Sequence, residues 1–408
     1  MRYRFPIVCV FICILIAGCG RKPAQLDNGI WRGTFQTDST IEIPFNFEVY
    51  DSAGTKQIAF INGEERLNIN ELQIEGDSVF FRTPLYETEI RAKLGDKTLE
   101  GTWVRTLPNL TQSMPFTAEY GADWRFVKEP KASKADVSGR WSVVFTKENT
   151  KDTTLAIGEF VQEGNLVQGT FLTNYGDYRF LSGEVDGDML RISAYGGMSP
   201  SLFTATISGD AMTGDMYSGP ANHSKWQAKK DPNAALADAY SLTKLKEGYN
   251  TLSFEFPDTE GNLVSLSDDR YKNKVVILQF LGSWCPNCMD ETIYLNSFYR
   301  KYKEKGAEVL ALAYERYAEP ERAKKAVTNL MDRFDMAYPV LLTGYTNSQV
   351  LESLPEMESF NAFPSTIIIN KKGEVHSIHT GFNGPATGQA YVDYITQFEQ
   401  TIIELLAE

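Results

Sequence analysis

The chain has 408 residues and a formal net charge of −13 at pH 7, with 42% hydrophobic and 23% charged residues. This length exceeds one ordinary domain and predicts two or three, with enough apolar residues to bury a core in each. The negative charge argues against a nucleic-acid-binding protein, because such a surface needs clustered Lys and Arg to neutralise phosphates.

Residues 1–19 have the pattern of a secretion signal. A positively charged start precedes the apolar run FPIVCVFICILIA at 5–17, which is shorter than the roughly 20 residues that span a membrane. The run closes with IAGC, an ending that resembles a bacterial lipoprotein signal, in which cleavage precedes the cysteine and its thiol receives lipid. We therefore expect a lipidated Cys19 and a short tether at 20–27. The alternative is an ordinary secretory signal with a chance cysteine.

The remaining cysteines form one close pair. Cys9 and Cys13 would leave with the signal and Cys19 would carry lipid, so Cys285 and Cys288 are the free thiols of the mature chain. Disulfide staples of secreted proteins come as several pairs spread along the chain, and a two-residue loop constrains the unfolded chain very little. A structural disulfide is therefore a poor explanation for this pair.

Residues 28–230 alternate apolar and polar side chains between turns rich in Gly, Asp and Asn. This pattern predicts antiparallel strands arranged in meanders. We predict two consecutive units, 28–128 and 136–230, each a small β-barrel or β-sandwich that loosely resembles lipocalin-like or avidin-like barrels.

The same region contains an internal repeat. Trp31 in NGIWRGTF matches Trp141 in VSGRWSVVF at an offset of 110 (141 − 31), and Gly101 matches Gly214 at an offset of 113 (214 − 101). IEGDSVFFR is likewise echoed by VDGDMLRIS in the same order. Matches at a nearly constant offset favour a duplicated unit of about one hundred residues, and the alternative is chance similarity between meanders.

The sequence pattern changes after the β-rich region. Residues 231–250 are polar and helix-prone, and we expect them to link or cap the last domain. From 251 to 408, apolar strands such as VVILQFL at 275–281 alternate with helical patterns such as PERAKKAVTNLMDRF at 320–334. This alternation indicates an α/β layer with parallel strands covered on both faces. The predicted fold class is therefore multidomain, an all-β duplicated region followed by an α/β domain.

Cys285 and Cys288 lie where the strand 275–281 ends and a helix begins. Pro286 suits the first helical position, because it has no N–H group that would remain unpaired there. The free N–H groups of a helix start carry partial positive charge and stabilise a thiolate. We predict that Cys285 is the attacking thiol and that Cys288, one turn further on, is the resolving thiol that closes the disulfide.

Zinc binding is the competing explanation for two cysteines at this spacing, but a zinc ion usually takes four ligands. The chain has no second cysteine pair after the signal, and its histidines are His223, His376 and His379. The last two are three residues apart on a predicted strand and would point to opposite faces. We therefore expect neither a metal nor an organic cofactor.

The segments VVILQFLGSWCPNCMDE, AEVLALAYE and AFPSTIIINKKGEV, with the terminal helix, resemble the thioredoxin superfamily over about 251–408. Within it they are similar to the membrane-tethered disulfide reductases called TlpA-like or ResA-like. The specific features are WCxxC after a buried strand and a proline, Pro364, 79 residues after the first cysteine (364 − 285). The resemblance implies a thioredoxin-like fold for 251–408.

The resemblance also implies roles for individual residues. Pro364 would be cis and lie against the active disulfide, and the backbone of Phe363 would hydrogen-bond the bound partner. Trp284 would shield the site, and Glu291 would take and return the proton of Cys288. The alternatives are a trans proline that opens a strand, a core tryptophan and a solvated acid in the first helical turn.

Four positions bear on how closely the family pattern applies. Gln279 replaces the buried Asp of thioredoxin, and Asn287 stands where many relatives have Pro. Gly282 stands where thiol peroxidases, a rival with the same fold, carry a threonine. Asp290 is expected to be a solvated acid without a role.

These observations predict a thiol–disulfide oxidoreductase, acting as a reductase on protein or small-molecule disulfides outside the cytoplasm. The expected location is a bacterial membrane, held by the lipid on Cys19 and facing the periplasm, with the outer membrane favoured. A membrane electron donor would re-reduce the cysteine pair, because such compartments are oxidising. The alternatives are a client- or ligand-binding lipoprotein with a redox arm and a thiol peroxidase-like enzyme.

Overall fold

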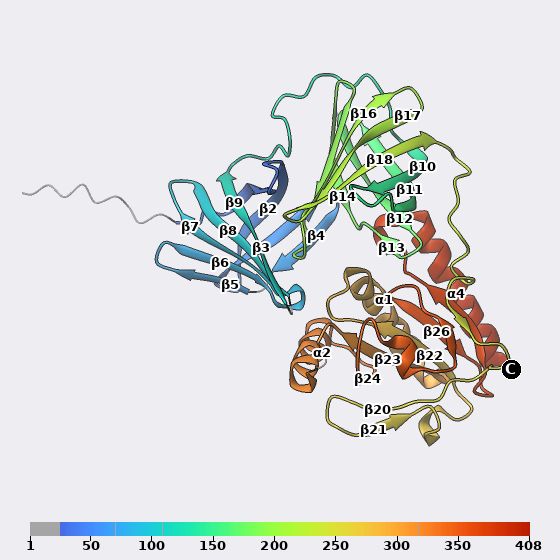
Figure 1. Cartoon of the computed structure of the whole chain (residues 1–408). Helices are drawn as coiled ribbons and strands as arrows, with labels where there is room; N and C mark the ends of the chain where they lie inside the picture. The colour runs from blue at the N-terminus through green and yellow to red at the C-terminus, as the bar shows by residue number, and fades with distance from the viewer. Residues whose placement is uncertain (1–24, 70, 108, 318) are drawn as a thin grey trace, which may run out of the picture.

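The structure is a computed structural model that describes residues 25–408 except 70, 108 and 318. Its chain forms two β-sheets of the amino-terminal region and a carboxy-terminal α/β domain, and the three meet around a common centre (Figure 1). The multidomain fold class is confirmed. The predicted signal and Cys19 lie outside the described residues.

The first sheet runs in the order β4-β3-β2-β1-β9-β8-β7-β6-β5, and its neighbouring strands are antiparallel. Its strands are β1 Gly29–Gln36, β2 Glu42–Ser52, β3 Thr55–Asn62, β4 Glu65–Ile69, β5 Glu71–Glu75, β6 Ser78–Thr83, β7 Thr88–Leu94, β8 Thr98–Leu107 and β9 Leu110–Tyr120. The first strand pairs with the last, so the meander curls into a barrel-like sheet. Aromatic side chains such as Trp31, Phe45 and Trp103 fill its core.

The second sheet is a closed antiparallel barrel with one short added strand. Its strands are β10 Gly139–Lys147, β11 Thr153–Glu163, β12 Leu166–Thr173, β13 Gly176–Asp177, β14 Leu181–Asp186, β15 Met189–Ala194, β16 Ser201–Ser208, β17 Ala211–Ser218 and β18 Asn222–Lys230. The barrel closes because β10 pairs with both β11 and β18, while β12 pairs with both β11 and β14. Its interior is also filled by aromatic rings, including Phe171, Phe203 and Trp226.

The two sheets share a structural detail that the sequence repeat predicts. The Trp31 indole donates a hydrogen bond to the carbonyl of Asp27, and the Trp141 indole donates to the carbonyl of Val137, at 3.0 and 2.8 Å. Each tryptophan is fully buried and bonds four residues back along the chain. The same contact at matching positions supports a duplicated unit.

The barrels are fixed to each other by a buried arginine. Arg125 follows β9 and donates to the Asn46 side chain of the first barrel at 3.1 Å and to the Ser193 carbonyl of the second at 2.8 Å. Asn62 and Tyr195 also exchange hydrogen bonds across this junction. Because buried polar groups need such partners, these contacts fix the two barrels side by side.

The α/β domain has a mixed sheet in the order β24-β23-β22-β26-β27, in which β22, β23 and β24 are parallel. Its strands are β22 Val275–Leu281, β23 Ala307–Glu315, β24 Val340–Thr346, β26 Ser365–Ile369 and β27 Val375–Thr380. Its helices are α1 Pro286–Tyr302, α2 Pro320–Phe334, α3 Val350–Ser353 and α4 Gln389–Ala407. All residues of β22 are buried, and alternate ones join the apolar clusters on the two faces.

Shorter elements complete the chain. They are the strands β19 Lys244–Leu245, β20 Glu255–Pro257, β21 Leu263–Ser265 and β25 Met357–Ser359, and the 3₁₀ helices η1 Pro84–Tyr86, η2 Asp269–Tyr271, η3 Lys303–Lys305 and η4 Pro385–Thr387. No helix of the described chain is both long enough and apolar enough to cross a membrane.

The expectation of helical structure at 231–250 is wrong. This segment contains turns and the short strand β19, which pairs with β25. The last domain supplies its hydrogen bonds: Lys246 N–H donates to Glu356, and the Ala239 carbonyl accepts from Thr380. Helix propensity is a weak preference, and these tertiary contacts override it.

Candidate active site

Cys285 and Cys288 lie at the start of α1, as predicted. Cys285 is the N-cap residue, and its sulfur accepts a hydrogen bond from the Cys288 N–H at 3.3 Å. Pro286 occupies the first helical turn. Both cysteines are free thiols, 5% and 1% exposed. The helix start therefore directs an N–H group at the Cys285 sulfur.

The predicted partner-binding residues surround Cys285. The Phe363–Pro364 bond is cis, and the Cys285 thiol donates to the Phe363 carbonyl with a sulfur–oxygen distance of 3.6 Å. The Trp284 indole packs edge-to-face on the Phe363 ring, with centroids 5.5 Å apart, and donates to the Tyr314 carbonyl at 3.0 Å. Both aromatic side chains are half-buried, so they flank the nucleophile without enclosing it.

Glu291 lies in a buried polar network behind the cysteines. Its carboxyl oxygens accept hydrogen bonds from Gln279 Nε2 at 2.9 Å and from Thr366 Oγ1 at 2.6 Å. Burial raises the pKa of Glu291 to about 7, although these two donors oppose the shift. A carboxyl group with this pKa can accept and return a proton near neutral pH.

Gln279 has a role that the sequence did not reveal. It is fully buried, and its amide joins Glu291 to Thr292 and to the Tyr338 hydroxyl, which donates to Gln279 Oε1 at 2.9 Å. The sequence showed only that the acid of thioredoxin is missing here. The structure shows that this amide donates to the carboxyl group of Glu291 on α1 and so orients it.

The Cys288 thiol is held in its protonated form. Burial raises its pKa well above the ordinary value, and the nearby Cys285 and Glu291 charges act in the same direction. Cys288 therefore needs a base before it can attack a disulfide.

The comparisons with known proteins agree with this geometry. A family model described as Redoxin matches residues 246–393. The thiol-disulfide oxidoreductase ResA of Bacillus subtilis is 33% identical over 149 residues, which cover 36% of this chain and 74% of the relative. The chain belongs to the ResA family of thiol-disulfide oxidoreductases.

Two further proteins match about the same share of this chain. ResA of Geobacillus kaustophilus is 34% identical over 139 residues, covering 34% of this chain and 72% of the relative. A solved thioredoxin-family thiol:disulfide interchange protein from Chlorobium tepidum has a TM-score of 0.30 and 18% identity, covering 40% of this chain and 98% of its own. The Redoxin match places the family similarity in the carboxy-terminal domain, and the two barrels precede it.

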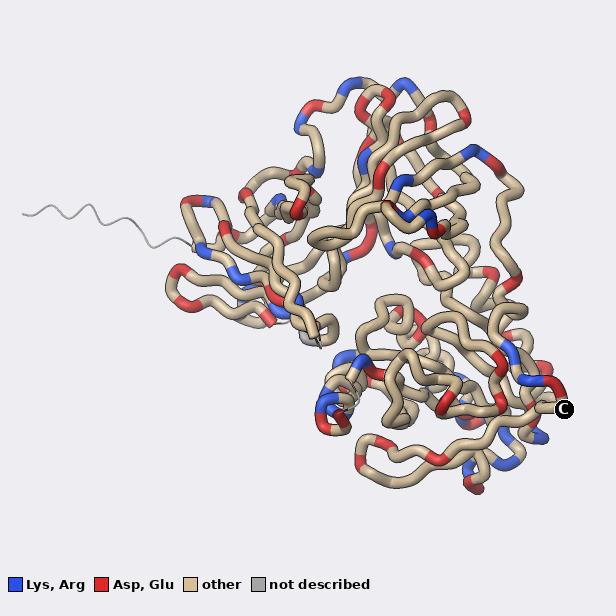
Figure 2. The backbone as a smooth tube through the Cα atoms, viewed as in Figure 1, with Lys and Arg blue, Asp and Glu red and all other residues tan. Residues whose placement is uncertain are grey.

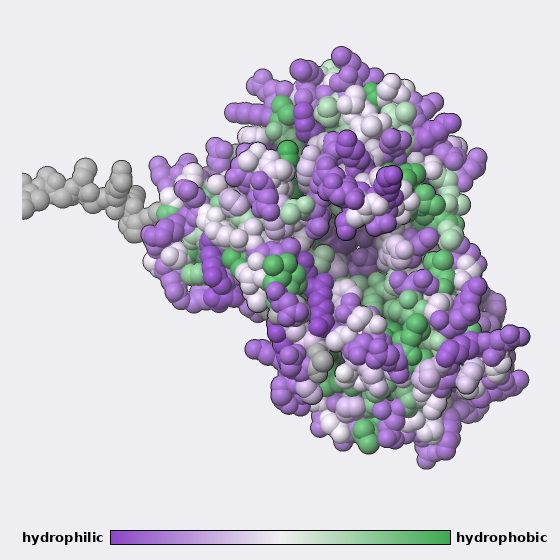
Figure 3. All heavy atoms as spheres, viewed as in Figure 1, coloured by the Kyte–Doolittle hydropathy of each residue, from purple (hydrophilic) through white to green (hydrophobic). Residues whose placement is uncertain are grey.

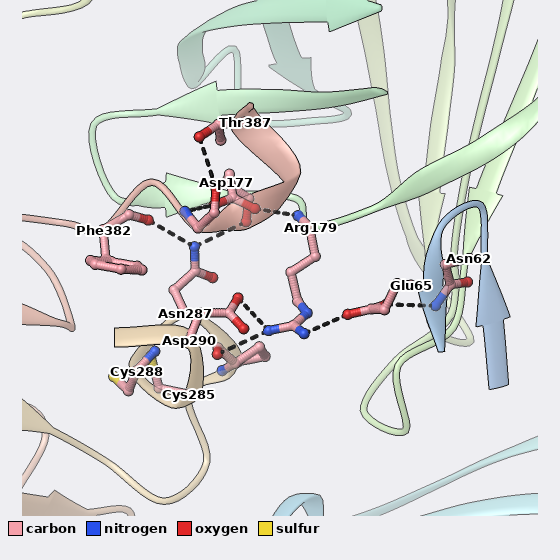
Figure 4. Close-up of polar contacts among 12 residues, drawn as sticks. Asn62, Glu65, Asp177, Arg179, Cys285, Asn287, Cys288, Asp290, Phe382 and Thr387 are labelled. Atoms are coloured by element: carbon pink, nitrogen blue, oxygen red, sulfur yellow. Dashed lines mark hydrogen bonds and ion pairs between the residues drawn. The ribbon is translucent and has the colours of Figure 1, made fainter. Parts of the chain in front are cut away.

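In this ResA-family protein the second barrel reaches the helix that carries the cysteines (Figure 4). Arg179 donates to the Asp290 carboxylate at 2.5 Å and to the Pro286 carbonyl at 3.3 Å. It also donates to Glu65 of the first barrel at 2.6 Å. One guanidinium group therefore links all three parts of the molecule at the first turn of α1.

This contact corrects the expectation that Asp290 is a solvated acid. Only 10% of its side chain is exposed, because Arg179 folds over it. Burial raises the pKa of Asp290, and Arg179 opposes the shift. The two residues are 111 positions apart, so no local sequence signal could pair them.

Asn287, between the two cysteines, is also held by the barrel. Its amide donates to the carbonyls of Asp177 at 3.2 Å and Phe382 at 3.3 Å. The Asp177 carboxylate accepts from Gly384 N–H at 2.6 Å, and burial, with the nearby Asp290, raises its pKa to about 6. A proline at position 287, as in many relatives, could not make these amide contacts.

The first barrel contacts the other side of the site. Leu85 packs against the apolar cluster that contains both cysteines. The Glu87 carboxylate accepts hydrogen bonds from the Tyr317 hydroxyl and from Arg322 at 2.9 Å. Both barrels therefore lie over the active-site face of the thioredoxin-like domain, and a space-filling view is hollowed where the parts meet (Figure 3).

Proposed function

We propose that this protein is a lipid-anchored disulfide reductase that acts outside the cytoplasm through the Cys285–Cys288 pair. The observation that carries the proposal is the placement of Cys285 Sγ at the start of α1. There it lies within hydrogen-bond distance of both the Cys288 N–H and the Phe363 carbonyl. This arrangement supports a reactive sulfur at a helix start, next to a backbone that can hold a partner and a second thiol that can resolve the mixed disulfide.

The reaction starts from the reduced pair. The Cys285 thiolate attacks one sulfur of the substrate disulfide, forms a mixed disulfide and releases the other substrate sulfur as a thiolate. Cys288 then attacks Cys285, which releases the second substrate thiolate and leaves a Cys285–Cys288 disulfide. Two electrons pass from the cysteine pair to the substrate.

Glu291 is the proposed base for the second step. It lies one helical turn beyond Cys288, and its charge raises the pKa of that thiol. Because its own pKa is about 7, it can take the Cys288 proton as the thiol attacks. It returns a proton when the pair is reduced again.

The location follows from the amino-terminal sequence. The IAGC ending at Cys19 supports a lipid anchor, and we place the protein on the outer membrane facing the periplasm. A membrane dithiol donor would supply the electrons, because an oxidising compartment would otherwise leave the pair as a disulfide.

Single-cysteine variants test this proposal. Cys285→Ser should abolish the reduction of insulin and of hydroxyethyl disulfide, whereas Cys288→Ala should accumulate a mixed disulfide that mass spectrometry detects. Unchanged turnover in Cys285→Ser would contradict the assignment of the nucleophile. For the Cys285–Cys288 couple, a reduction potential of about −270 mV would support a reductase, and one of about −120 mV would indicate an oxidant instead.

Two observations weigh against the rival functions. A side-chain Cβ at Gly282 would lie 2.1 Å from the Trp284 indole nitrogen, so the threonine of a peroxidase does not fit unless Trp284 moves. The barrel interiors are filled by aromatic side chains, which suits a docking or positioning role better than an apolar ligand lumen.

A further inference from the structure

A cavity of about 320 Å³ opens beside the nucleophile, between the thioredoxin-like domain and the first barrel. Its lining includes Ser283, Trp284, Glu315, Arg316, Lys325 and Glu87. Cys285 is not among the lining residues, but Trp284 directly precedes it and Arg316 of the lining is near enough to feel the charge of Cys285. The volume is at the lower end of the range for small-molecule sites, which is roughly 300–1,000 Å³.

Both acids of the cavity already have hydrogen-bond donors. One Glu87 oxygen accepts from the Tyr317 hydroxyl and the other from Arg322. The Glu315 oxygens accept from the Ser283 N–H at 2.8 Å and the Ser283 hydroxyl at 2.7 Å. Burial raises the pKa of Glu315, although the two Ser283 donors oppose the shift.

Three cations line the cavity: Arg322 is paired with Glu87, whereas Arg316 and Lys325 have no such partner among the described residues. Within the described chain, no carboxylate oxygen lies within 4.0 Å of a charged nitrogen of Arg316 or Lys325. Arg316 is half-buried and lies over the Trp284 ring at 4.8 Å, which fixes its guanidinium beside the nucleophile. Lys325 lies on α2, where Lys and Arg gather on the backbone view (Figure 2).

A fourth cation, Arg105, lies near Arg316 outside the lining. Arg105 of β8 is 7% exposed, and its Nε and one terminal nitrogen have no hydrogen-bond partner among the described residues. Burial and the nearby Arg316 lower the pKa of Arg105 to about 10. The lining and Arg105 therefore contain more basic than acidic side chains, in a chain whose net charge is −13.

We propose that this cavity binds a carboxylate of the substrate, so that the preferred substrates are disulfides with acidic groups close to the sulfur atoms. Arg316 would hold the carboxylate through charge-assisted hydrogen bonds, and Lys325 would add a second positive charge. The inference rests on the proposed function and adds a substrate class to it. The exchange itself is unchanged: Cys285 and Cys288 supply the two electrons.

Three small disulfides of similar size test the inference: dithiodipropionate is a dianion, hydroxyethyl disulfide is neutral and cystamine is a dication. Each is mixed with the reduced full chain, and the loss of free thiols is followed in a single turnover. The expected order is dianion, neutral, dication. The rate should differ about tenfold between neighbouring members of this order, because a hydrogen bond to a charged group stabilises by at least that ratio.

The variant Arg316→Gln should lose about tenfold of the rate with dithiodipropionate and retain the rate with hydroxyethyl disulfide. Arg316→Lys keeps the charge and should keep most of the preference. Lys325→Gln should have a smaller effect in the same direction. Lys324→Gln is the matched control, since Lys324 is an exposed neighbour on α2 outside the cavity lining.

Equal rates for the three disulfides would overturn the inference. So would a variant Arg316→Gln that slows all three equally, because Arg316 would then act on the Cys285 thiolate. If no disulfide oxidises the wild-type pair, the proposed function itself fails, and the inference falls with it. The carboxylate could belong to a peptide or to a small molecule, and disulfide-containing peptides with flanking Glu, or with flanking Lys as the control, distinguish the two. If the Glu peptide reacts faster than dithiodipropionate, the substrate is a peptide. If it reacts more slowly, the substrate is a small acid.

Discussion

Arg179, in the loop between β13 and β14 of the second barrel, lies 2.5 Å from the carboxylate of Asp290, on the helix that begins next to Cys285. The same guanidinium lies 2.6 Å from Glu65 of the first barrel. An arginine shared by two acids at this depth links the barrels to the redox site. The amino-terminal region therefore forms part of the active-site surroundings.

The variant Arg179→Gln should lower the free energy of unfolding by about 3 kcal/mol, because it leaves two largely buried carboxylates without their cation. Urea unfolding followed by tryptophan fluorescence measures this loss. Arg300→Gln is the control, since Arg300 pairs with Asp335 at 2.8 Å on an exposed surface and should contribute less than about 1 kcal/mol. Equal losses in the two variants would show that the Arg179 pairs are weak.

The variant Asn287→Pro should loosen the second barrel from the site. Proline is tolerated in the first helical turn, so α1 should remain, but the amide contacts to Asp177 and Phe382 are lost. Amide hydrogen exchange near β13 should then become at least about tenfold faster, as expected for the loss of a hydrogen bond or more. Exchange in β16 of the same barrel should not change. An unaffected β13 would mean that Asn287 does not hold the barrel.

The variant Glu291→Gln should slow the second chemical step by about 100-fold, the low end for a lost general base. Stopped-flow measurements with a chromogenic disulfide separate release of the first thiolate, which needs only Cys285, from release of the second. The wild-type rate of the second step should rise with pH through about 7, where Glu291 ionises. A variant that slows both steps equally would contradict the assigned role.

Glu291 should also make stability depend on pH. Its pKa rises from 4.5 to about 7 on folding, so between these values the folded chain binds more protons than the unfolded chain. Stability should therefore fall as pH rises from about 4.5 to 7, on the order of 3 kcal/mol for one such group. Urea midpoints across this range measure the slope. Glu291→Gln should flatten it, and a substitution of the exposed Glu404 should not.

Much of the carboxy-terminal domain could be predicted from local patterns. The buried strand β22 and the cysteines at the start of α1 follow from an apolar run and helix-start residues, whereas the cis proline before β26 was implied by the family resemblance. These signals lie within short segments, so the sequence displays them directly. The repeat at Trp31 and Trp141 was visible for the same reason, since each copy keeps its own local contacts.

The predictions that were wrong or missing depend on contacts between residues that are distant in sequence. Asp290 was expected to be solvated, and residues 231–250 were expected to be helix-prone, because the groups that contact them are distant in sequence. The role of Gln279 depends on Glu291 and Tyr338, which come from other elements. Burial and pairing of this kind arise only when the elements pack.

The sequence by itself determined the position of the cysteine pair at a helix start, because an apolar strand, Pro286 and the cysteine spacing are all local signals. Tertiary structure alone decided what surrounds that pair. It placed Arg179 against Asp290, Asn287 against Asp177 and an unneutralised Arg316 beside Trp284. The physical reason is that charge pairing and burial depend on distance in space, which a linear order of residues does not contain.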